Sequence, residues 1–479
     1  MYLQELLNGV SYEILGCGNP NVTSLCCDTG AVKPGCLFFC LTGQKFDGHN
    51  FFRKALGDGA VALVCERTLD TKALQIVVSD ARAAMSQIAK NFYENCADKM
   101  KIISIVGTNG KTSTSYILDS ILTKAGYKTA IIGTNGIFFN GQRHDNALTT
   151  PDPINLHYWF RQMYLDKVQI VIMEVSAHAI ALKKMRGIIS EFAIFTNFSQ
   201  DHLDFFKTMQ KYGETKRSYF VEEYVRNAVV NIDDKLGKQI AEEFPNVATY
   251  STERAADGVA GEISLSASSS EFNLNVYGQS AHVCSKLSGI FNVYNILAAI
   301  TCAASMGVDI DTATTAVSDI AYINGRNETI LRNDGMRVVI DFAHTPDGVE
   351  NILRYLKRTT DGNLIVVFGC GGNRDKYKRP LMAEKVSEFA DFAVLTNDNP
   401  RFEDPRAIAQ DVVSRLTCPH KVILNRSQAT EFALSAAKAS DTVAILGKGS
   451  ETYQEIKGKK FPYSDVDVVQ DLLAKNFDT

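Results

Sequence analysis

Short runs of apolar, often β-branched residues recur along most of this chain, and helical stretches separate most of them. Each run is apolar throughout, as expected of a strand that is covered on both faces of a sheet. Alternation of such strands with helices predicts βαβ units and mostly parallel sheets, so the predicted fold class is α/β. The runs form two groups: 102–106, 129–132, 170–173, 193–196 and 228–231, and then 338–340, 364–368, 392–395 and 443–446.

The length of 479 residues is enough for about three domains. We expect a small α/β domain at 1–99, a central sheet domain at 100–324 and a third α/β domain at 325–479. In the central domain, a polar stretch at 251–270 precedes the alternating segment 272–276, which predicts an antiparallel extension of the sheet. The first domain has two predicted strands, within 32–41 and 60–64.

Composition excludes several other classes of protein. The formal charge of −4 lacks the basic excess of a nucleic-acid binder, so no nucleic-acid partner is expected. No apolar run approaches the roughly 20 residues that span a bilayer, and the first residues do not resemble a signal peptide. We therefore expect a cytoplasmic protein without membrane insertion. The 11 cysteines suggest no disulfide framework, and Cys26, Cys27, Cys36 and Cys40 are expected to be buried thiols rather than zinc ligands.

The strongest local motif is the segment GTNGKTS at 107–113, which lies between a predicted strand and a predicted helix at 116–125. Glycines let backbone N–H groups approach phosphate oxygens, and the N-terminus of a helix favours an anion. Lys111 is expected to reach the outer phosphates of a nucleotide, and the Thr112 hydroxyl to bind Mg²⁺. The competing interpretation is a glycine-rich turn with an incidental lysine. A nucleotide loop alone does not distinguish a kinase from a motor or a ligase.

Two further polar side chains follow consecutive strands of the central domain. Glu174 stands at the end of one strand, and His202 follows the next. A carboxylate suits Mg²⁺ well, whereas imidazole is an unusual Mg²⁺ ligand, so His202 alone would more simply be a loop histidine. The combination of Thr112, Glu174 and His202 at one sheet edge predicts a metal site.

The segment GTNGKTS and nine other motifs, in order along the chain, resemble those of the Mur ligases, ATP-dependent amide-forming enzymes of peptidoglycan precursor synthesis. The resemblance is strongest to the MurE type, which adds the third residue of the peptide. It covers nearly the whole chain and implies three domains, with a central P-loop domain and a Rossmann-like C-terminal domain. The other motifs are LTTPDP (148–153), MEVSAHA (173–179), FTNFSQDHLD (195–204), GIFNVYNILAA (289–299), GRNE (325–328), IDFAHTPDG (340–348), VVFGCGGNRDKYKRP (366–380), DNPRFEDP (398–405) and GKGSE (447–451).

The resemblance implies a reaction in which ATP converts a carboxylate into an acyl phosphate that an amine then attacks, with ATP and two Mg²⁺ ions as cofactors. It implies that Lys111, Glu174, His202 and Lys216 are catalytic, and that Lys216 is carbamylated. The implied metal ligands are Thr112, Glu174, His202 and the Lys216 carbamate. The implied ATP-binding residues are Gly107, Thr108, Asn109, Gly110, Lys111, Thr112, Ser113, Asn295, Arg326, Asp341 and His344.

The implied substrates are UDP-N-acetylmuramoyl-L-alanyl-D-glutamate, whose UDP part the first domain would bind, and meso-diaminopimelate, which the third would bind. Diaminopimelate has a second carboxylate that Arg401 of the DNPR motif could hold; with L-lysine, a fully buried Arg401 left unpaired would cost about 3–5 kcal/mol. A monomer is expected. The acceptor-binding residues would be Thr29, Gln44, Thr149, Thr150, Ser176 and Lys184, and the amino-acid-binding residues Arg374, Asp398, Asn399, Pro400, Arg401, Gly447 and Glu451.

Other functions stay open at this point. The same ligase could use L-lysine or another diamino acid, or the fold could serve a folylpolyglutamate synthetase-like enzyme. A catalytically inactive nucleotide-binding scaffold is the alternative from another class. It is motivated by departures from the family pattern on the acceptor side, at Gly30, Leu182, Lys184 and Phe206.

Overall fold

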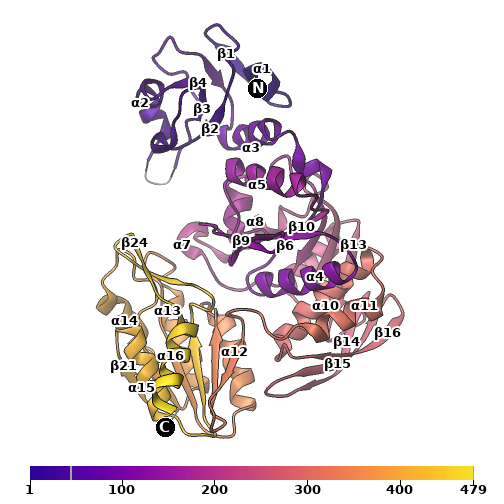
Figure 1. The fold of residues 1–479 in the computed structure, drawn as a ribbon, viewed down its shortest axis with the longest axis vertical. Coiled ribbons are helices and arrows are strands. Elements are labelled where there is room, and N and C mark those ends of the chain that lie inside the picture. The colour runs from indigo at the N-terminus through magenta and orange to yellow at the C-terminus, as the bar shows by residue number, and fades with distance from the viewer. Residues whose placement is uncertain (44–45, 478–479) are drawn as a thin grey trace. The chain divides into compact units, whose positions relative to one another are not determined.

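The computed structural model describes residues 1–43 and 46–477, so the predicted acceptor residue Gln44 lies outside the described residues. The chain forms two compact units. The first consists of Met1–Val106, Tyr127–Ala193 and Ser218–Ala228; the second consists of Gly107–Gly126, Ile194–Arg217 and Val229–Thr479. Figure 1 gives the labels of the helices and strands. The domain boundaries near residues 99 and 324 remain predictions.

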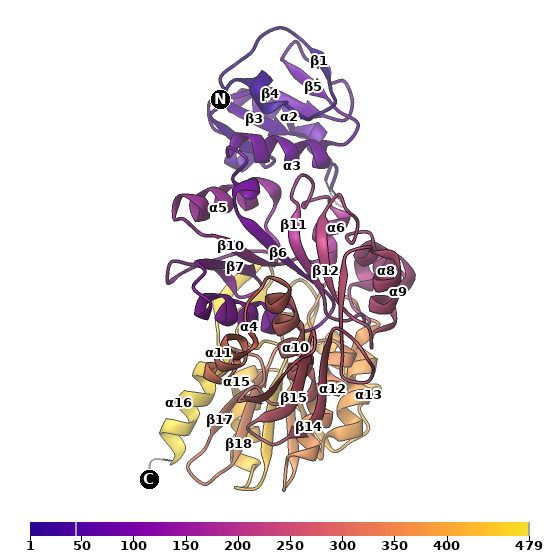
Figure 2. The same cartoon turned by 90° about the vertical axis from the view of Figure 1, so that its right-hand side faces the viewer.

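The N-terminal part of the first unit is a five-stranded sheet in the order β1-β5-β4-β3-β2, in which only β1 is antiparallel to its neighbour. Helix α3 packs on one face of this sheet (Figure 2). The strands are β1 (Glu13–Leu15), β2 (Ser24–Cys26), β3 (Cys36–Phe39), β4 (Ala60–Cys65) and β5 (Gln75–Val77). The helices are α1 (Leu3–Leu6), α2 (Phe52–Gly57) and α3 (Ala81–Phe92), with short 3₁₀ turns at Thr29–Ala31, Gly48–Phe51 and Cys96–Lys99.

Strand β3 is buried on both faces, as its continuous apolar sequence predicts. Leu37 and Phe39 contribute to the core beneath α3, whereas Cys36 and Phe38 contribute to the core on the opposite face. Of the four cysteines that we expected to be buried thiols, Cys26, Cys36 and Cys40 are buried; Cys27 is exposed because it follows the end of β2.

The first unit also holds the strands β6 (Lys101–Val106), β10 (Ile170–Glu174) and β7 (Thr129–Gly133), which run parallel in that order. Strands β8 (Gly136–Phe139) and β9 (Gln142–His144) continue β7 as an antiparallel meander. Helices α5 (Pro153–Leu165) and α6 (Ala177–Ala181) follow β9 and β10 along the chain. Strands β11 (Ser190–Phe195) and β12 (Val225–Asn231) contribute residues to both units.

In the second unit, strand β13 (Val247–Ser251) pairs in parallel with β14 (Gly258–Leu265), and the antiparallel strands β15 (Ser270–Val276) and β16 (Gln279–Ser285) follow. The antiparallel extension that we predicted at 272–276 is confirmed. The central strands form a mixed sheet, because β8, β9, β15 and β16 pair antiparallel with their neighbours; of these four, only β15 was predicted. The helices are α4 (Lys111–Lys124), α7 (Leu203–Phe206), α8 (Met209–Arg217), α9 (Lys235–Glu243), α10 (Ile290–Ser305) and α11 (Ile310–Asp319).

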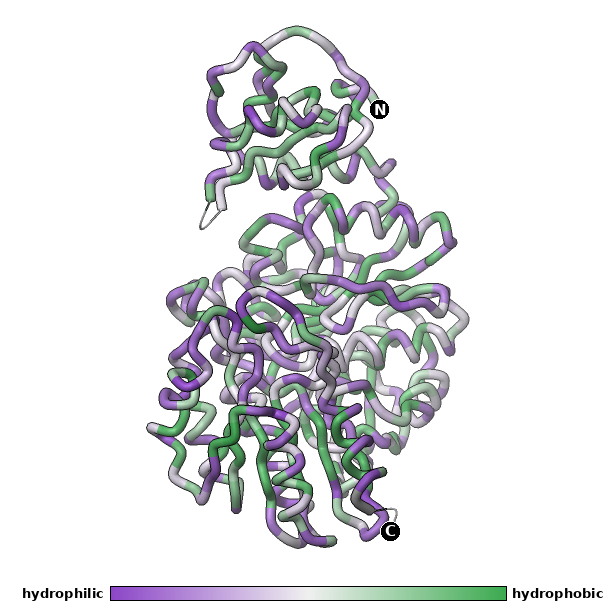
Figure 3. The backbone as a smooth tube through the Cα atoms, turned by 60° about the vertical axis from the view of Figure 1, so that its left-hand side comes forward, coloured by the Kyte–Doolittle hydropathy of each residue, from purple (hydrophilic) through white to green (hydrophobic). Residues whose placement is uncertain are grey.

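The C-terminal part of the second unit is a doubly wound α/β domain, which confirms the Rossmann-like prediction. Its sheet has the order β17-β18-β22-β19-β20-β21, and all neighbours except β17 and β18 are parallel. Hydrophobic residues concentrate along its strands (Figure 3). The strands are β17 (Glu328–Leu331), β18 (Arg337–Asp341), β19 (Leu364–Phe368), β20 (Phe392–Leu395), β21 (His420–Val422) and β22 (Thr442–Leu446).

Helices cover both faces of this C-terminal sheet. Helices α12 (Pro346–Arg358), α13 (Lys378–Phe389) and α14 (Pro405–Val413) share one apolar core with it, and α15 (Arg426–Ala436) and α16 (Asp465–Phe477) share the other. A two-stranded hairpin of β23 (Tyr453–Ile456) and β24 (Lys459–Pro462) lies between β22 and α16 in sequence. The carboxyl ends of β18, β19, β20 and β22 therefore lie at one edge, where a ligand site is expected.

Candidate active site

The phosphate loop joins the end of β6 to the start of α4, as predicted. Gly110 caps the helix with a φ of 85°, a left-handed conformation that favours glycine. A Cβ atom on Gly110 would lie 2.4 Å from Oδ1 of Asn295, and one on Gly107 would lie 1.9 Å from Oγ1 of Thr196. The left-handed turn therefore favours glycine at position 110, and the close approach of Thr196 favours it at position 107.

Two lysine ammonium groups converge on the carbonyl oxygen of Gly107. Nζ of Lys111 donates to this oxygen at 2.9 Å and to the Thr108 carbonyl at 2.8 Å, and Nζ of Lys216 donates to the Gly107 oxygen at 2.7 Å. The side chain of Lys216 is almost fully buried, with its ammonium 4.7 Å from the ring centroid of Tyr212. Burial, and then the charge of Lys111, lower the pKa of Lys216 well below its usual value. The same two effects make Lys216 easier to deprotonate than an exposed lysine.

The segment after β11 supports the phosphate loop from outside. Oγ1 of Thr196 donates to the Asn109 carbonyl at 2.7 Å, and the backbone N–H of Asn109 donates to Oδ1 of Asn197 at 2.9 Å. The Thr108 hydroxyl donates to the Ser199 carbonyl at 3.2 Å. These hydrogen bonds hold the loop against the segment after β11. The loop can therefore keep its conformation when no nucleotide is bound.

His202 lies at the end of the same segment, in a left-handed conformation with a φ of 57°. Its Nε2 is 3.3 Å from the buried carboxylate of Asp201, which also lies 3.2 Å from Nζ of Lys378 and 3.7 Å from Nε2 of His344. Burial alone would raise the pKa of Asp201, but Lys378, His202 and His344 hold it well below its usual range. The predicted residues His202 and His344 are therefore brought together by a carboxylate that the sequence did not single out.

Arg326 contacts the phosphate loop directly. Its Nη2 donates to Oγ1 of Thr112 at 3.0 Å, and its guanidinium lies 4.3 Å from the ring centroid of Phe342. Asp341, at the end of β18, accepts hydrogen bonds at 2.7 Å from the backbone N–H groups of Asn327 and Ala343. Burial raises the pKa of Asp341, against the opposing charge of Arg326.

Asn109 connects the phosphate loop to the start of α12, and Asn295 connects α10 to α4. Nδ2 of Asn109 donates to Asp347 of α12 at 2.8 Å, and its Oδ1 accepts from the Thr345 hydroxyl at 3.3 Å. Asn295 of α10 accepts a hydrogen bond from Thr114 at 3.3 Å. Asp347 and Thr345 were not predicted as site residues, although both belong to the motif at 340–348.

Glu174 is held in the first unit, where both of its carboxylate oxygens are occupied. Oε1 accepts from the backbone N–H of Thr134 at 2.9 Å, and Oε2 accepts from the Thr134 hydroxyl at 3.0 Å. The side chain is 1% exposed, and a Cβ on Gly133 would lie 2.2 Å from Oε1. Its register opposite Ile105 puts it at the carboxyl end of the parallel strands, as predicted.

Four of the predicted acceptor residues gather near Glu174 in the first unit. The Thr149 hydroxyl lies 3.1 Å from that of Thr134, and the Thr150 hydroxyl donates to the Glu174 carbonyl at 2.9 Å and accepts from the Ser176 N–H at 3.0 Å. Nζ of the buried Lys184 donates to the Thr150 carbonyl at 3.2 Å and pairs with Asp152 at 2.9 Å. Within the described residues, Thr29 takes no part in these contacts and lies in a 3₁₀ turn of the N-terminal sheet.

Three of the predicted amino-acid residues, Asp398, Asn399 and Glu451, gather around a lysine that was not predicted. Nζ of Lys448, fully buried, donates to Oδ1 of Asn399 and to Glu451, both at 3.0 Å, and lies 3.4 Å from Asp398. Burial would raise the pKa of Asp398, but Lys448 first and Arg426 next lower it. Gly447, beside Asp398, has a φ of 112°, a backbone conformation that favours glycine. The Lys448 ammonium and the carboxylates of Asp398 and Glu451 thus form one charged cluster.

The argument from the sequence assumed that Arg401 has no partner unless the amino acid provides a carboxylate. The structure shows that it has two partners within the protein. Its Nε donates to Glu455 of β23 at 3.0 Å, and its Nη1 donates to the Gly372 carbonyl at 2.9 Å. The sequence could not reveal this pair, because Glu455 lies 54 positions away on a separate hairpin. Arg374 is exposed; desolvation, and then the like charge of Arg401, lower its pKa. Pro400 contributes its backbone, which Gly372 approaches closely enough to exclude a Cβ.

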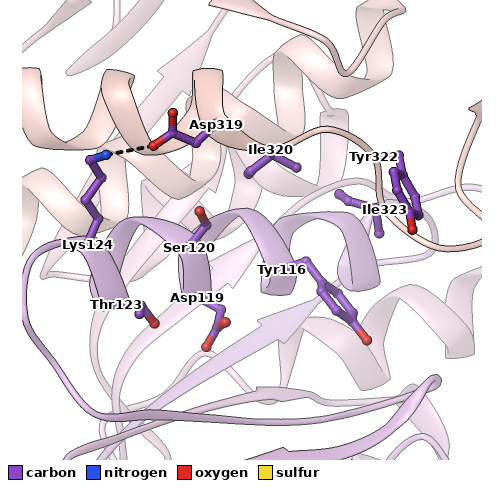
Figure 4. Close-up of a pocket in the computed structure, with 9 residues that line it drawn as sticks. All are labelled: Tyr116, Asp119, Ser120, Thr123, Lys124, Asp319, Ile320, Tyr322 and Ile323. Atoms are coloured by element: carbon purple, nitrogen blue, oxygen red, sulfur yellow. Dashed lines mark hydrogen bonds and ion pairs between the residues drawn. The ribbon is translucent and has the colours of Figure 1, made fainter. Parts of the chain in front are cut away.

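A separate pocket of about 410 Å³ lies between α4 and the segment that follows α11 (Figure 4). It is lined by Tyr116 and Tyr322, and by Lys124 and Asp319, which form an ion pair at 2.7 Å. Its lining includes none of the residues predicted for the active site. The pocket therefore adds nothing to the nucleotide site described above.

The donor set suits Mg²⁺ only in the presence of further oxygen ligands. Thr112 and Glu174 offer oxygens, which Mg²⁺ prefers, and a carbamate on Lys216 would offer two more. In the described parts of the chain, no group of three or more His, Cys, Asp or Glu side chains could hold a metal ion. Each of these oxygens, Thr112 in the second unit and Glu174 in the first, by itself suits an ion whose other ligands include nucleotide phosphates. Separately, no helix among the described residues is long and apolar enough to cross a membrane.

The phosphate loop and the doubly wound domain that contacts it define a nucleotide-using α/β enzyme, and comparison with known proteins gives its family. A model of the "Mur ligase middle domain" matches residues 105–303, one of the "Mur ligase, glutamate ligase domain" matches 325–449, and one of the "Mur ligase family, catalytic domain" matches 21–93. The chain belongs to the Mur ligase family, the ATP-dependent amide ligases, and to its MurE type.

Two full-length relatives carry the name UDP-N-acetylmuramoyl-L-alanyl-D-glutamate–2,6-diaminopimelate ligase. That of Caldanaerobacter subterraneus subsp. tengcongensis is 39% identical over 99% of this chain and 100% of its own length; that of Bacillus velezensis is 40% identical over 94% of each. A solved structure of a ligase with this name has a TM-score of 0.68, 31% identity and 96% coverage of both chains. The Mycobacterium tuberculosis folylpolyglutamate synthase, at 17% identity and a TM-score of 0.62, shares the fold alone.

Proposed function

We propose that this chain joins meso-diaminopimelate to UDP-N-acetylmuramoyl-L-alanyl-D-glutamate, with conversion of ATP to ADP and phosphate. The observation that carries the proposal is the group around Arg401, Asp398, Asn399 and Glu451, which offers a guanidinium for a second carboxylate and carboxylates for an ammonium. The names of the two full-length relatives support the same substrates. Under this proposal the protein works in the cytoplasm, as a monomer.

The first chemical step transfers the γ-phosphoryl group of ATP to the acceptor carboxylate and forms an acyl phosphate. Lys111 is placed on the phosphate loop, so incoming phosphate oxygens would replace the carbonyl oxygens that its ammonium now contacts. Arg326 would supply a second positive charge at the same loop. Bound Mg²⁺, held by Thr112, Glu174, His202 and a carbamate on Lys216, would neutralise phosphate charge during the transfer.

In the second step, the amine of the diamino acid attacks the acyl carbon, a tetrahedral intermediate forms, and inorganic phosphate leaves as the amide closes and the amine loses its proton. The residues near Asp398 would hold the incoming amino acid by its distal charges and so orient the attacking amine. On the acceptor side, we assign Thr149, Thr150, Ser176 and Lys184 to the dipeptide and its nucleotide sugar, together with Thr29 and Gln44.

Product formation with purified components tests the proposal. The chain is incubated with ATP, Mg²⁺, the nucleotide dipeptide and either meso-diaminopimelate or L-lysine, and products are identified by mass spectrometry while phosphate is measured. We expect an amide product with diaminopimelate, and phosphate release that requires both the acceptor and the amino acid. Absence of product with meso-diaminopimelate would overturn the proposal, and a product with L-lysine alone would establish the first alternative.

A further inference from the structure

The backbone of Arg401 is fixed against the β23–β24 hairpin. Its N–H donates to the Glu455 carbonyl at 3.0 Å, and its carbonyl accepts from the Lys457 N–H at 2.7 Å. Its φ of 51° is a left-handed conformation, uncommon for a residue with a side chain. Because the hairpin holds this conformation, the start of the Arg401 side chain has a defined direction.

The guanidinium of Arg401 is held at two of its three nitrogens. Nε donates to Oε2 of Glu455, and Nη1 donates to the Gly372 carbonyl; a Cβ on Gly371 would lie only 3.0 Å from Nη1. The side chains of Arg401 and Glu455 are 16% and 24% exposed. Among the described residues, Nη2 has no partner. The edge formed by Nη1 and Nη2 is thus the one that can still grip a carboxylate in bidentate fashion.

Glu455 changes the charge that an incoming amino acid meets at this place. Without Glu455, the nearby positive groups would be Arg401 and Arg374, which repel a distal ammonium and attract a distal carboxylate. With Glu455, the net charge around Arg401 falls by one, so the ammonium is repelled less and the carboxylate is attracted less. Arg401 also keeps a partner when the amino acid has no distal carboxylate, which reduces the penalty of a buried unpaired charge.

We propose that Glu455 is a specificity-determining residue. It reduces the factor by which this chain prefers a diamino acid with a distal carboxylate over one without it. The proposal rests on the function proposed above, since it concerns the amino acid which that ligase accepts. Glu455 acts through Arg401 as a positioning and neutralising residue and takes no part in the chemical steps. Its substitution should therefore alter KM values for the amino acid rather than kcat.

The test compares the wild type with Glu455→Gln, which keeps the size and a hydrogen-bond acceptor but removes the charge. We expect the ratio of kcat/KM for meso-diaminopimelate to that for L-lysine to rise about tenfold, through changes in KM. Loss of the Glu455 charge strengthens the attraction of a distal carboxylate and strengthens the repulsion of a distal ammonium. If L-lysine is turned over too slowly, its inhibition constant against meso-diaminopimelate replaces the second value. Glu388→Gln removes a similar charge from an exposed pair with Lys385 on α13 and should leave the ratio unchanged.

A ratio that stays within twofold of the wild type, or that falls, would overturn the role of Glu455. Glu455→Asp should keep the wild-type ratio, and if Glu455→Gln folds poorly, the pair Glu455→Asp and Glu455→Asn gives the same comparison of charge with shape. The proposed function fails in a different way, because then the wild type itself forms no product with meso-diaminopimelate. If the wild type is active and Glu455→Gln has the same ratio, only the inference about Glu455 is overturned.

Discussion

Nη2 of Arg326 donates a hydrogen bond of 3.0 Å to Oγ1 of Thr112, across 214 positions of the sequence. Arg326 directly precedes the C-terminal α/β sheet, and Thr112 is the phosphate-loop hydroxyl that is expected to bind Mg²⁺. A guanidinium that can contact both this hydroxyl and incoming phosphates connects nucleotide binding to the C-terminal domain.

Arg326→Ala should therefore lower kcat/KM for ATP by about 10- to 100-fold, since one positive charge is lost from the phosphate site. Steady-state kinetics with ATP varied and both other substrates saturating measures this effect. Arg354→Ala removes an arginine from an exposed pair with Glu350 on α12 and serves as the control. Equal kinetics of Arg326→Ala and the control would show that Arg326 has no part in nucleotide use.

Lys111→Ala should reduce turnover by about 10²- to 10³-fold or more, because its ammonium is the charged group of the phosphate loop and is expected to reach the outer phosphates of ATP. Lys124, on the same helix, pairs with Asp319 at an exposed position and provides the matched control (Figure 4). Lys124→Ala should retain near wild-type turnover. Phosphate release is measured for both variants, after thermal unfolding has shown that each is folded; intact turnover in Lys111→Ala would contradict the assignment of the phosphate loop.

Lys216 should carry a carbamate in the presence of bicarbonate. Burial and the charge of Lys111 lower its pKa, so more of the amine is unprotonated near neutral pH, and an unprotonated amine adds CO₂ and releases a proton. Labelling with ¹³C-bicarbonate should give a protein-bound carbonyl signal in the NMR spectrum. Lys216→Arg should abolish the signal, whereas Lys211→Arg, an exposed position on the same helix, should keep it. A signal that survives in Lys216→Arg belongs to another group.

The phosphate loop could be predicted because all of its information is local. Glycines, Lys111 and Thr112 follow one another between a strand and a helix, and the structure keeps that order. The apolar strands of the two larger sheets were predictable for a similar reason, since continuous burial leaves a continuous apolar run. Strand β14 was missed, because it alternates small and polar residues within a serine-rich stretch and carries a bulge.

The ion pairs of the site could not be predicted, because they join residues far apart in the sequence. Lys378 reaches Asp201 across 177 positions, and Glu455 reaches Arg401 across 54. The pattern around each of these residues is compatible with an exposed charge on a helix or a hairpin. Only the packing of separate elements decides which charge is buried and which partner it meets.

The pair of Arg426 and Asp465 provides a test of stability that is independent of the active site. Arg426 begins α15 and Asp465 begins α16; both side chains are at most 1% exposed, and they share two hydrogen bonds of 2.8 and 2.7 Å. Their mutual attraction, which opposes the cost of burial, raises the pKa of Arg426. Arg426→Met leaves the Asp465 carboxylate buried with only the Tyr463 hydroxyl as a remaining side-chain donor among the described contacts.

Arg426→Met should therefore lower the free energy of unfolding by about 3–5 kcal/mol, the usual result of leaving one member of a buried pair. Urea unfolding followed by circular dichroism measures the change, with the slope checked for constancy. Lys54→Met, which breaks an exposed pair between Lys54 on α2 and Asp58 just after it, should cost at most about 1 kcal/mol. Adding Asp465→Asn to Arg426→Met should recover part of the loss, since the unpaired charge is then gone. A loss in Arg426→Met no larger than that in Lys54→Met would mean that water or a neighbouring group reaches the Asp465 carboxylate.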